Sequence, residues 1–402
     1  MASSFTENTR VQVPAALHLC RLGYTYLDHI QEFDGRTNIL TDVFIRSVKR
    51  LNPLMNDLEC QQLIDKIAGM VNNDDLGREF YSLLSANSGL KLVDYANPEN
   101  NEWHVTTEFS CENAESGDNF RPDITCFING LPLVFIEVKK PNNHDGILAE
   151  RDRINKRMRN RAFRRFFNLT QLMIFSNNQE YDNDNRVPIQ GAFYCTGSRS
   201  YSPFNCFREE NPTNSEIAPY IKNYNYHTVN EDVEKKILFD FNCQVIHDAL
   251  EYKKNKDINT PTNSILTSMC SPERFLYILK YGIAYVKTEK EVDGKIETTD
   301  QKHIMRYQQL FGSMAIRQKL DEGITAGVVW HTQGSGKTAL SYYLTSILTD
   351  YFSRKNIVAK FYFIVDRLDL LEQATQEFEA RGLKVSTANS KIELMEQFRT
   401  LY

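Results

Sequence analysis

The chain has 402 residues, more than one ordinary domain holds, so we expect two or three folded units. Its 47 Lys and Arg residues against 52 Asp and Glu residues give a net charge of −5, so any nucleic-acid contact requires a local basic patch. A hydrophobic content of 41% and a charged content of 25% exclude collagen-like, low-complexity and largely disordered classes.

The cysteines and the N-terminus indicate a cellular compartment. The 8 cysteines are scattered, with no Cys-x-x-Cys pair and no histidine cluster at zinc spacing, so we predict reduced core residues. The first residues lack the basic start and apolar stretch of a signal peptide, and no run approaches the roughly 20 apolar residues of a membrane span. The sequence therefore predicts a cytoplasmic protein with no membrane association.

The first motif in chain order is a hairpin that carries two acids and a lysine. Asp123 precedes one apolar run, Asn129-Gly130 is a strong turn signal, and the second run ends with Glu137 and Lys139. This order is typical of PD-(D/E)xK nucleases, in which two carboxylates bind Mg²⁺. Asp123 and Glu137 would be the metal ligands, and Lys139 would hold the attacking water and offset developing charge. The alternative is an exposed hairpin with ordinary surface charges.

The loop of this hairpin decides whether its acids meet. A two-residue turn would place Asp123 opposite Ile136, with its side chain on the wrong face. A three-residue loop over 128–130 with a G1 bulge would place Asp123 opposite Phe135 and all three groups on one face. We favour the three-residue loop.

A basic segment follows the hairpin. Residues 150–165 read ERDRINKRMRNRAFRR, in contrast to the acidic chain as a whole. Beside a phosphodiester site such a segment would bind the DNA backbone, whereas elsewhere it would be a solvated helix face. The candidate DNA contacts in it are Arg151, Arg153, Lys156, Arg157 and Arg161.

Polar connections and a well-marked helix follow. Residues 208–216 and 253–264 have the composition of connections, and the second is the preferred domain boundary. Ser271 and Pro272 are typical of a helix start, so we expect a helix through residues 275–286. Residues 292–296 suggest a small hairpin.

The most specific motif is a glycine-rich loop. An apolar run at 324–330 predicts a strand, residues 331–338 read HTQGSGKT, and helical spacing follows. This strand, loop and helix are typical of a P-loop, whose backbone N–H groups bind ATP phosphates. Lys337 would reach the β- and γ-phosphates and Thr338 would ligate Mg²⁺. The predicted ATP-binding residues of the loop are Gly334, Ser335, Gly336, Lys337 and Thr338.

One position of the loop departs from the P-loop pattern. His331 stands where the full pattern has Gly or Ala, and the alternative is a glycine-rich turn before a surface lysine. Further on, the run 361–365 predicts a buried strand that ends at Asp366-Arg367, followed by a helix at 370–373. This alternation favours a parallel α/β sheet and the beginning of a RecA-like fold.

Several strings together resemble the restriction subunit of type I restriction-modification enzymes. These strings are LGYTY, LNP, FRPDITCFINGLPLVFIEVKKPNN, NLTQLMIFSNN, SPERFLYILKYGIAYV, IMRYQQLF, WHTQGSGKT and FIVDRLDLLEQ, in the family's order. The resemblance spans nearly the whole chain and is more specific than any single motif.

The resemblance implies an α/β architecture of two parts. Residues 1–255 would be the PD-(D/E)xK endonuclease domain, a mixed sheet flanked by helices, and residues 256–402 the first part of a RecA-like superfamily 2 helicase domain. Arg306, Tyr307 and Gln309, or Gln308 in place of Gln309, would contact adenine. Asp366 and Arg367 would form the next motor motif and contact DNA.

The resemblance also implies cofactors and partners. The cofactors would be Mg²⁺ and ATP, and the partners double-stranded DNA and the methylation (M) and specificity (S) subunits. In the family the intact complex hydrolyses ATP to pull DNA and cuts at a distance from the recognised sequence.

Two departures limit the resemblance. The first concerns the nuclease: the family's auxiliary Gln-x-x-x-Tyr has its nearest match in Gln171-x-x-x-Phe175, which we expect in a strand. The second concerns the motor: no Asp-Glu-x-x motif, arginine finger or second lobe occurs before Tyr402. We therefore expect an incomplete motor. The alternatives are a stand-alone nuclease-helicase of repair or defence and a non-catalytic DNA-binding or assembly module. Cutting only with partner subunits, cutting without them, or no cutting distinguishes the three.

Overall fold

The chain forms two compact units. The computed structural model describes residues 6–28, 30, 32–112, 119–143, 146–181, 190–198, 202–209, 219–292, 295–388 and 390–399, without the side chains of 288–298. Unit 1 consists of Met1–Ile283 with Asp300–Phe311, and unit 2 of Ala284–Thr299 with Gly312–Tyr402. The boundary between residues 255 and 256 that the sequence suggests lies inside unit 1.

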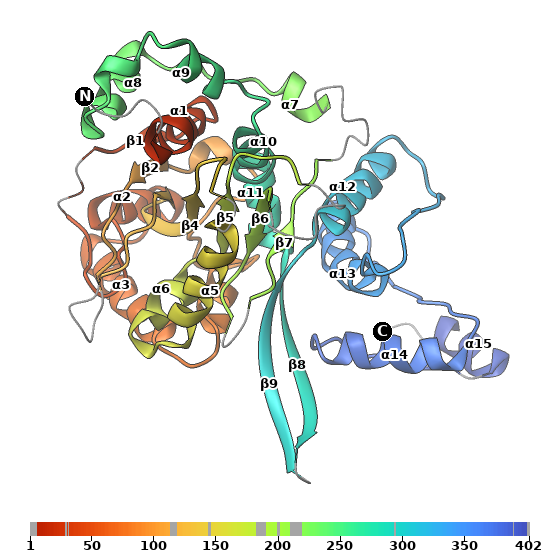
Figure 1. Ribbon diagram of the computed structural model, residues 1–402. Helices are drawn as coiled ribbons and strands as arrows, with labels where there is room; N and C mark the ends of the chain where they lie inside the picture. Colours follow the sequence, from red (N-terminus) through yellow and green to blue (C-terminus); the bar gives the residue numbers. More distant parts are fainter. Residues whose placement is uncertain are drawn as a thin grey trace. The chain divides into compact units, whose positions relative to one another are not determined.

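Unit 1 is built on a mixed sheet of order β1-β2-β3-β4-β5-β6-β7 (Figure 1). Its strands are Thr25–Tyr26, Trp103–Thr107, Ile124–Ile128, Leu131–Val138, Leu172–Ser176, Ala192–Cys195 and Asn205–Cys206. The pairs β1·β2 and β4·β5 are parallel and the other neighbours are antiparallel. The central strands β3 and β4 are buried along their whole length, as expected for strands covered on both faces.

Helices surround this sheet. They are α1 (Val13–Arg21), α2 (Thr41–Leu51), α3 (Asp57–Val71), α4 (Arg78–Leu84), α5 (Gly146–Arg159), α6 (Arg164–Leu169), α7 (Pro219–Asn223), α8 (Glu231–Asp240), α9 (Leu250–Asn255), α10 (Pro261–Cys270) and α11 (Pro272–Tyr281). A π-helical turn, Asn8–Gln12, precedes α1.

The two faces of the sheet pack differently. An aromatic core that includes Phe127 of β3, Phe135 of β4 and Phe175 of β5 packs against α5 and α6. Helices α1 and α10 contact one another and the strands β2 and β6, respectively. Because side chains alternate along a strand, the residues that share a face with Phe135 point toward α5. Glu137 is one of them.

The helix start at Ser271 is confirmed, but the expected end at 286 is wrong. Helix α11 ends at Tyr281 with Gly282 as its C-cap, and the apolar residues after it form β8 (Ile283–Val292), which pairs with β9 (Lys295–Ile304). The small hairpin is thus longer than predicted, and its turn lies outside the described residues.

The two predicted connections have different outcomes. Most of 208–216 lies outside the described residues. The segment 253–264 is wrong as a plain connection, because it contains the end of α9 and the start of α10. Thr260 caps α10 through the backbone N–H of Asn263, and Pro261 occupies its first turn. Turn-forming residues here act as helix start signals.

Unit 2 contains α13 (Lys337–Ser353), α14 (Leu368–Glu379) and α15 (Lys391–Arg399), whereas α12 (Tyr307–Asp321) begins in unit 1. The predicted helices after the glycine-rich loop and after Arg367 are confirmed. The predicted strands at 324–330 and 361–365 are wrong, because neither run has a strand partner among the described residues. Val328 and Ile364 are exposed, and an extended run without a ladder is not a strand.

The cysteines are free, and seven of the eight are buried, as predicted for reduced core residues. Within the described ranges, the helices are all too short or too polar to cross a membrane.

Candidate functional site

The acid-bearing hairpin forms with the turn that was not favoured. Ile128 pairs with Leu131, so the loop has the two residues Asn129 and Gly130, with φ of 51° and 81°. These angles fit a type I′ turn. A Cβ on Gly130 would lie 2.7 Å from the carbonyl oxygen of Leu40, so only glycine fits there. The predicted three-residue loop over 128–130 is wrong.

The acids nevertheless lie on one face, because a bulge occurs further along the hairpin. The register shifts between Cys126 and Phe127, after which Ile124 pairs with Ile136. Continuing the ladder by one residue places Asp123 opposite Glu137, not opposite Phe135 as predicted. Residues directly opposite one another share a face, so the expected grouping holds for a different reason.

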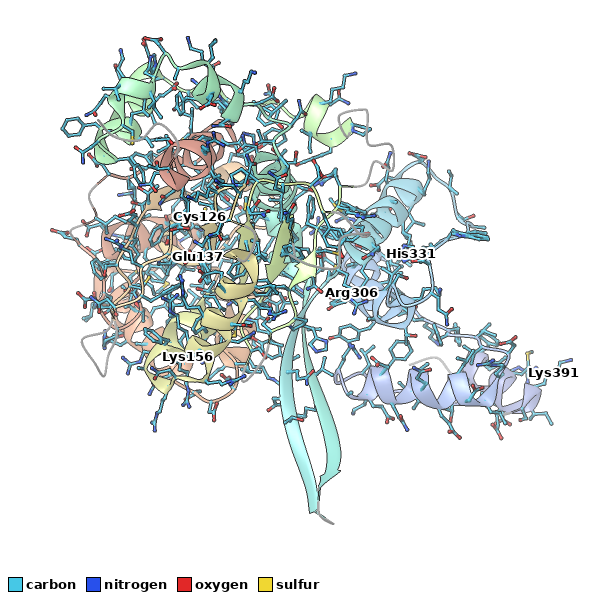
Figure 2. All side chains as sticks on the ribbon, in the orientation of Figure 1. Cys126, Glu137, Lys156, Arg306, His331 and Lys391 are labelled. Carbon is cyan, nitrogen blue, oxygen red and sulfur yellow. The ribbon has the colours of Figure 1, made fainter. Side chains whose placement is uncertain are left out.

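Lys139 lies at the centre of this group. Its Nζ is 3.6 Å from carboxylate oxygens of Asp123, Glu137 and Glu7, and 3.9 Å from one of Glu150. The structure therefore brings together the three residues that the sequence predicts and adds two acids. We call Glu7, Asp123, Glu137, Lys139 and Glu150 the carboxylate cluster; Glu137 lies on β4 (Figure 2).

The cluster holds more negative than positive charge. Burial, together with the charges of Asp123 and Glu150, raises the pKa of Glu137 well above its usual range. Burial also disfavours the charged form of Lys139, but the surrounding carboxylates outweigh it and raise the pKa of the ammonium. Lys139 Nζ donates to the carbonyl of Val138 at 2.8 Å, so a carbonyl oxygen faces the same space.

Glu150 is a member that sequence reasoning assigned only to the basic segment. It lies on α5, its side chain is 1% exposed, and it accepts from Arg153 at 2.8 Å. Arg157 lies 3.9 Å from its other oxygen, for which no hydrogen-bond partner is found among the described residues. Burial raises the pKa of Glu150. One sequence signal could have identified Glu150: it is a glutamate in a basic helix that directly follows the strand ending in Glu137 and Lys139.

Glu7 comes from the opposite end of the sequence. It precedes the π-helical turn, and its carboxylate accepts from the backbone N–H of Lys140 at 3.3 Å. Gln12 donates to the backbone carbonyl of Asp123 at 2.8 Å, which ties the same turn to the hairpin. Burial raises the pKa of Glu7. No sequence signal pointed to this residue, because the contact spans more than a hundred positions.

The chemistry of these donors suits a hard divalent cation. Carboxylate oxygens are what Mg²⁺ uses in proteins, with one or two from the chain and the rest from water and phosphate. Within the described residues, no three acidic, cysteine or histidine side chains are arranged tightly enough to hold a metal by themselves. Mg²⁺ needs only one or two carboxylates from the protein, and Asp123 and Glu137 can supply them.

The basic segment divides into residues that serve the cluster and residues on the surface. Arg153 binds Glu150, and Arg157 stacks 4.2 Å over the ring of Phe120. Arg151 pairs with its neighbour Asp152 at 3.2 Å. Lys156, labelled in Figure 2, and Arg161 are exposed. Of the five predicted DNA contacts in this segment, Arg153 and Arg157 thus already contact protein groups.

The glycine-rich loop has the backbone that was predicted. Gly334 and Gly336 have φ of 79° and 80°, and Gly336 caps the first turn of α13, which begins at Lys337. Lys337 Nζ donates to the carbonyls of His331 at 3.2 Å and Thr332 at 3.3 Å. The Lys337 side chain thus folds back onto the backbone of the loop that precedes it.

The departure at His331 has a structural counterpart. A Cβ on Gly312 of α12 would lie 3.0 Å from His331 Nε2, so a glycine in the helix makes room for the imidazole. Ser335 donates its hydroxyl to the carbonyl of Thr332 at 2.8 Å, which adds a second closing bond to the loop.

The predicted adenine contacts lie at the start of α12. The side-chain oxygen of Gln309 accepts from the backbone N–H of Arg306 at 2.9 Å and so caps the helix. The side-chain oxygen of Gln308 is buried without a hydrogen-bond partner among the described residues. These residues and Tyr307 belong to unit 1 and the loop belongs to unit 2, so the adenine contact stays a prediction. Asp366 and Arg367 precede α14, where Arg367 pairs with Asp369 at 2.8 Å.

The nearest match to the auxiliary glutamine lies elsewhere. Gln171 is buried just before β5, and its oxygen accepts from Lys302 at 2.8 Å. Burial lowers the pKa of Lys302 to about 7. Gln171 is thus part of the packing between β5 and β9 and has no place in the carboxylate cluster.

Comparisons with known proteins give two family models, one for each part of the chain, and several relatives. Residues 4–182 match the model for the type I restriction enzyme R protein N terminus, and residues 308–401 match the SWI2/SNF2 ATPase model. A putative type I restriction enzyme endonuclease subunit (MjaVIIP) of Methanocaldococcus jannaschii is 28% identical over 72% of this chain and 22% of its own length. A second subunit (MjaIXP) of that organism is 24% identical over 98% of this chain and 36% of its own. The type I restriction enzyme SauMSSORF170P endonuclease subunit of Staphylococcus aureus is 26% identical over 92% of this chain and 33% of its own length. The chain spans at most about a third of these relatives.

Proposed function

Because residues 4–182 of this chain belong to the family of the type I restriction enzyme R protein N terminus, we propose that it works in an endonuclease subunit that cuts DNA. The carboxylate cluster carries this proposal. The hairpin places two acids and a lysine together at the end of β4, the arrangement that PD-(D/E)xK nucleases use. We further propose that the cutting complex includes methylation and specificity subunits.

We assign the metal to the paired acids. Asp123 and Glu137 would hold Mg²⁺, with the Val138 carbonyl facing the same space. When bound, Mg²⁺ lowers the pKa of the attacking water and polarises the scissile phosphate.

The other side chains of the carboxylate cluster compensate charge and position Lys139. Lys139 remains protonated, because its carboxylate neighbours raise its pKa, and it offsets the negative charge that develops on the phosphate. Glu150 holds the ammonium from α5, and it is itself held by Arg153. Glu7 contacts the ammonium from the N-terminal side.

Unit 2 supports an ATP-driven motor as the second part of the proposal. Gly334 and Gly336 have positive φ immediately before α13, the glycine conformation that lets a loop at a helix N-terminus approach phosphates closely. Lys337 would leave the His331 and Thr332 carbonyls to reach the phosphates, and Thr338 would ligate the Mg²⁺ of ATP. The SWI2/SNF2 ATPase match over residues 308–401 supports this assignment.

The two activities can be separated by substitution in the complete complex. Glu137→Ala or Lys139→Ala should lower cutting at least about 100-fold while ATP hydrolysis stays near normal, because the cluster and the loop belong to different units. Lys337→Ala should abolish ATP hydrolysis and also stop cutting, if DNA must be pulled before it is cut. Normal cutting by Glu137→Ala would contradict the proposed nuclease site.

A further inference from the structure

The residue by which the glycine-rich loop departs from the P-loop pattern packs against a helix of the same unit. His331, labelled in Figure 2, starts the loop at the position where the pattern has Gly or Ala. A Cβ on Gly312 of α12 would lie 3.0 Å from Nε2 and 3.2 Å from Cε1 of its imidazole, and both residues belong to unit 2. The loop therefore carries the large side chain of this contact and the helix the small one.

Gly312 provides space for the imidazole and not an unusual backbone conformation. It lies inside α12 with a φ outside the left-handed region, and glycine is less favourable than alanine in such a place. Leu340 of α13, the next nearest side chain, would be 3.6 Å from the same Cβ, which is an ordinary van der Waals contact. The imidazole of His331 is therefore the group that a side chain at position 312 would press against.

The main chain of His331 is held by the lysine that would reach the phosphates. Lys337 Nζ bonds the carbonyls of His331 and Thr332, and we call this arrangement the closed loop. In the proposed nucleotide complex, Lys337 leaves both carbonyls for the β- and γ-phosphates. The backbone of His331 then loses a partner, at the residue whose side chain contacts α12.

The imidazole is able to follow that change. Its Nδ1 is buried and has no hydrogen-bond partner in the part of the chain that the structure describes. A ring that is held by packing can move without breaking a polar bond, whereas a hydrogen-bonded ring would resist. The contact with Gly312 can therefore differ between the closed loop and the loop that binds nucleotide.

Gly312 lies where α12 passes from one unit to the other. Residues 307–311 belong to unit 1, and residues 312–321 belong to unit 2. Because each N–H of an α-helix bonds the carbonyl four residues before it, neighbouring turns move together. A change at Gly312 therefore also acts on the first turn of α12.

We propose that His331 is a positioning residue that couples nucleotide binding in the loop to α12. It packs against Gly312 in the closed loop and withdraws when Lys337 binds phosphate. The proposal rests on the proposed ATP-binding function of the loop. By linkage, a substitution that strains the closed loop alone shifts the equilibrium toward the nucleotide-binding loop and so tightens nucleotide binding.

Calorimetric titration of ATP into the full chain, in buffer that contains Mg²⁺ throughout, tests the coupling. Gly312→Ala should tighten ATP binding about threefold or more, because the added methyl presses on the imidazole only in the closed loop. In a His331→Ala background, the same substitution should change the affinity less than about twofold. Gly69→Ala, in a helix with open space around its Cβ position, is the matched control and should also stay within about twofold. Thermal unfolding of each variant checks that the fold is intact.

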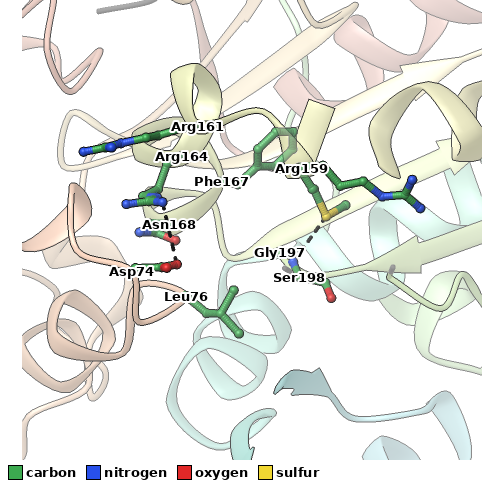
Figure 3. Close-up of a pocket in the computed structure, with 10 residues that line it drawn as sticks. Asp74, Leu76, Arg159, Arg161, Arg164, Phe167, Asn168, Gly197 and Ser198 are labelled. Atoms are coloured by element: carbon green, nitrogen blue, oxygen red, sulfur yellow. Dashed lines mark hydrogen bonds and ion pairs between the residues drawn. The ribbon is translucent and has the colours of Figure 1, made fainter. Parts of the chain in front are cut away.

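Two more variants show where ATP binds. Lys337→Ala should abolish binding, whereas Arg159→Gln, in the pocket of unit 1 that Figure 3 shows, should leave the affinity within about twofold. The lack of any binding that depends on Lys337 would contradict the proposed nucleotide site, and the coupling with it. Lys337-dependent binding that Gly312→Ala leaves unchanged or weakens, or that it tightens equally without His331, would overturn the coupling alone.

Discussion

Lys139 has twice as many acidic neighbours as its motif contains. The sequence predicts Asp123 and Glu137 because period-two alternation and a turn signal place them near one another. Glu7 and Glu150 reach the same ammonium from a π-helical turn and from α5, through tertiary packing that no local pattern encodes. The local chemistry was therefore predictable, and the outer members of the cluster were not.

Glu150 should act as a positioning residue for Lys139. Replacing it by glutamine keeps its shape but removes the charge that faces Lys139 and Arg157, so Glu150→Gln should destabilise the fold by about 1–3 kcal/mol. Cutting should fall roughly tenfold, as is usual for groups that orient a ligand shell from behind. Denaturant unfolding and single-turnover cleavage measure the two effects.

The control for this substitution is its exposed neighbour in the same helix. Asp152 is 71% exposed and pairs with Arg151, so Asp152→Asn should leave both stability and cutting nearly unchanged. Equal effects of the two substitutions would mean that Glu150 acts only through the charge of the helix.

At the scale of elements, the hairpin shows where prediction from sequence ends. Asn129-Gly130 marked the position of the turn, but the favoured three-residue loop was wrong, and Leu133, the extra residue of β4 opposite β3, has no sequence signal. A bulge adds one residue to one strand and so inverts the faces beyond it. The favoured loop gave the right faces because it also introduced a one-residue shift, in the opposite direction and at another place, and a shift of one residue in either direction inverts the faces.

Gly130 should be among the least replaceable residues of the hairpin. Its φ is 81°, and a Cβ would lie 2.8 Å from the backbone nitrogen of Phe44, so Gly130→Ala should destabilise unit 1 by at least about 2 kcal/mol. Gly69 on α3 has open space around its Cβ position, so Gly69→Ala should stabilise by roughly 0.5–1 kcal/mol. Denaturant midpoints give both values, and the same sign for the two substitutions would contradict the turn geometry.

The packing of α1 on α10 should make unit 1 sensitive to acid. His18 is buried and bonds Thr267 at 2.7 Å, and burial lowers its pKa from 6.5 to about 3. Between these two values the unfolded chain binds a proton that the folded chain does not, so stability falls as the pH falls below 6.5. The loss should be about 1.4 kcal/mol per pH unit, or about 2 kcal/mol by pH 5.

Comparison of variants isolates this contribution. His18→Gln should flatten the dependence of unfolding free energy on pH between 7 and 5. Parallel curves for wild type and His18→Gln would show that the histidine is not buried as a neutral group.

For the whole molecule, the two parts of the chain differ in how far the sequence predicts them. In unit 1, the strands on either side of Asn129-Gly130 and the start of α11 at Ser271 are as expected. In unit 2, the helices form but the apolar runs at 324–330 and 361–365 do not form strands. The backbone hydrogen bonds of a helix join residues of the same segment, whereas those of a strand require a neighbouring strand that can be distant in sequence. Both runs are apolar enough for a buried strand, but neither pairs with another strand among the described residues.

The most direct test of the account is calorimetric titration of Mg²⁺ into the chain without nucleotide. The wild-type chain should bind Mg²⁺ at the carboxylate cluster, Glu137→Gln should abolish this binding, and the exposed substitution Glu372→Gln on α14 should not affect it. Because burial and nearby carboxylates raise the pKa of Glu137, Mg²⁺ competes with a proton, so affinity should increase with pH. Mg²⁺ binding by Glu137→Gln with wild-type affinity, or an affinity independent of pH, would contradict the assignment of the metal to this hairpin.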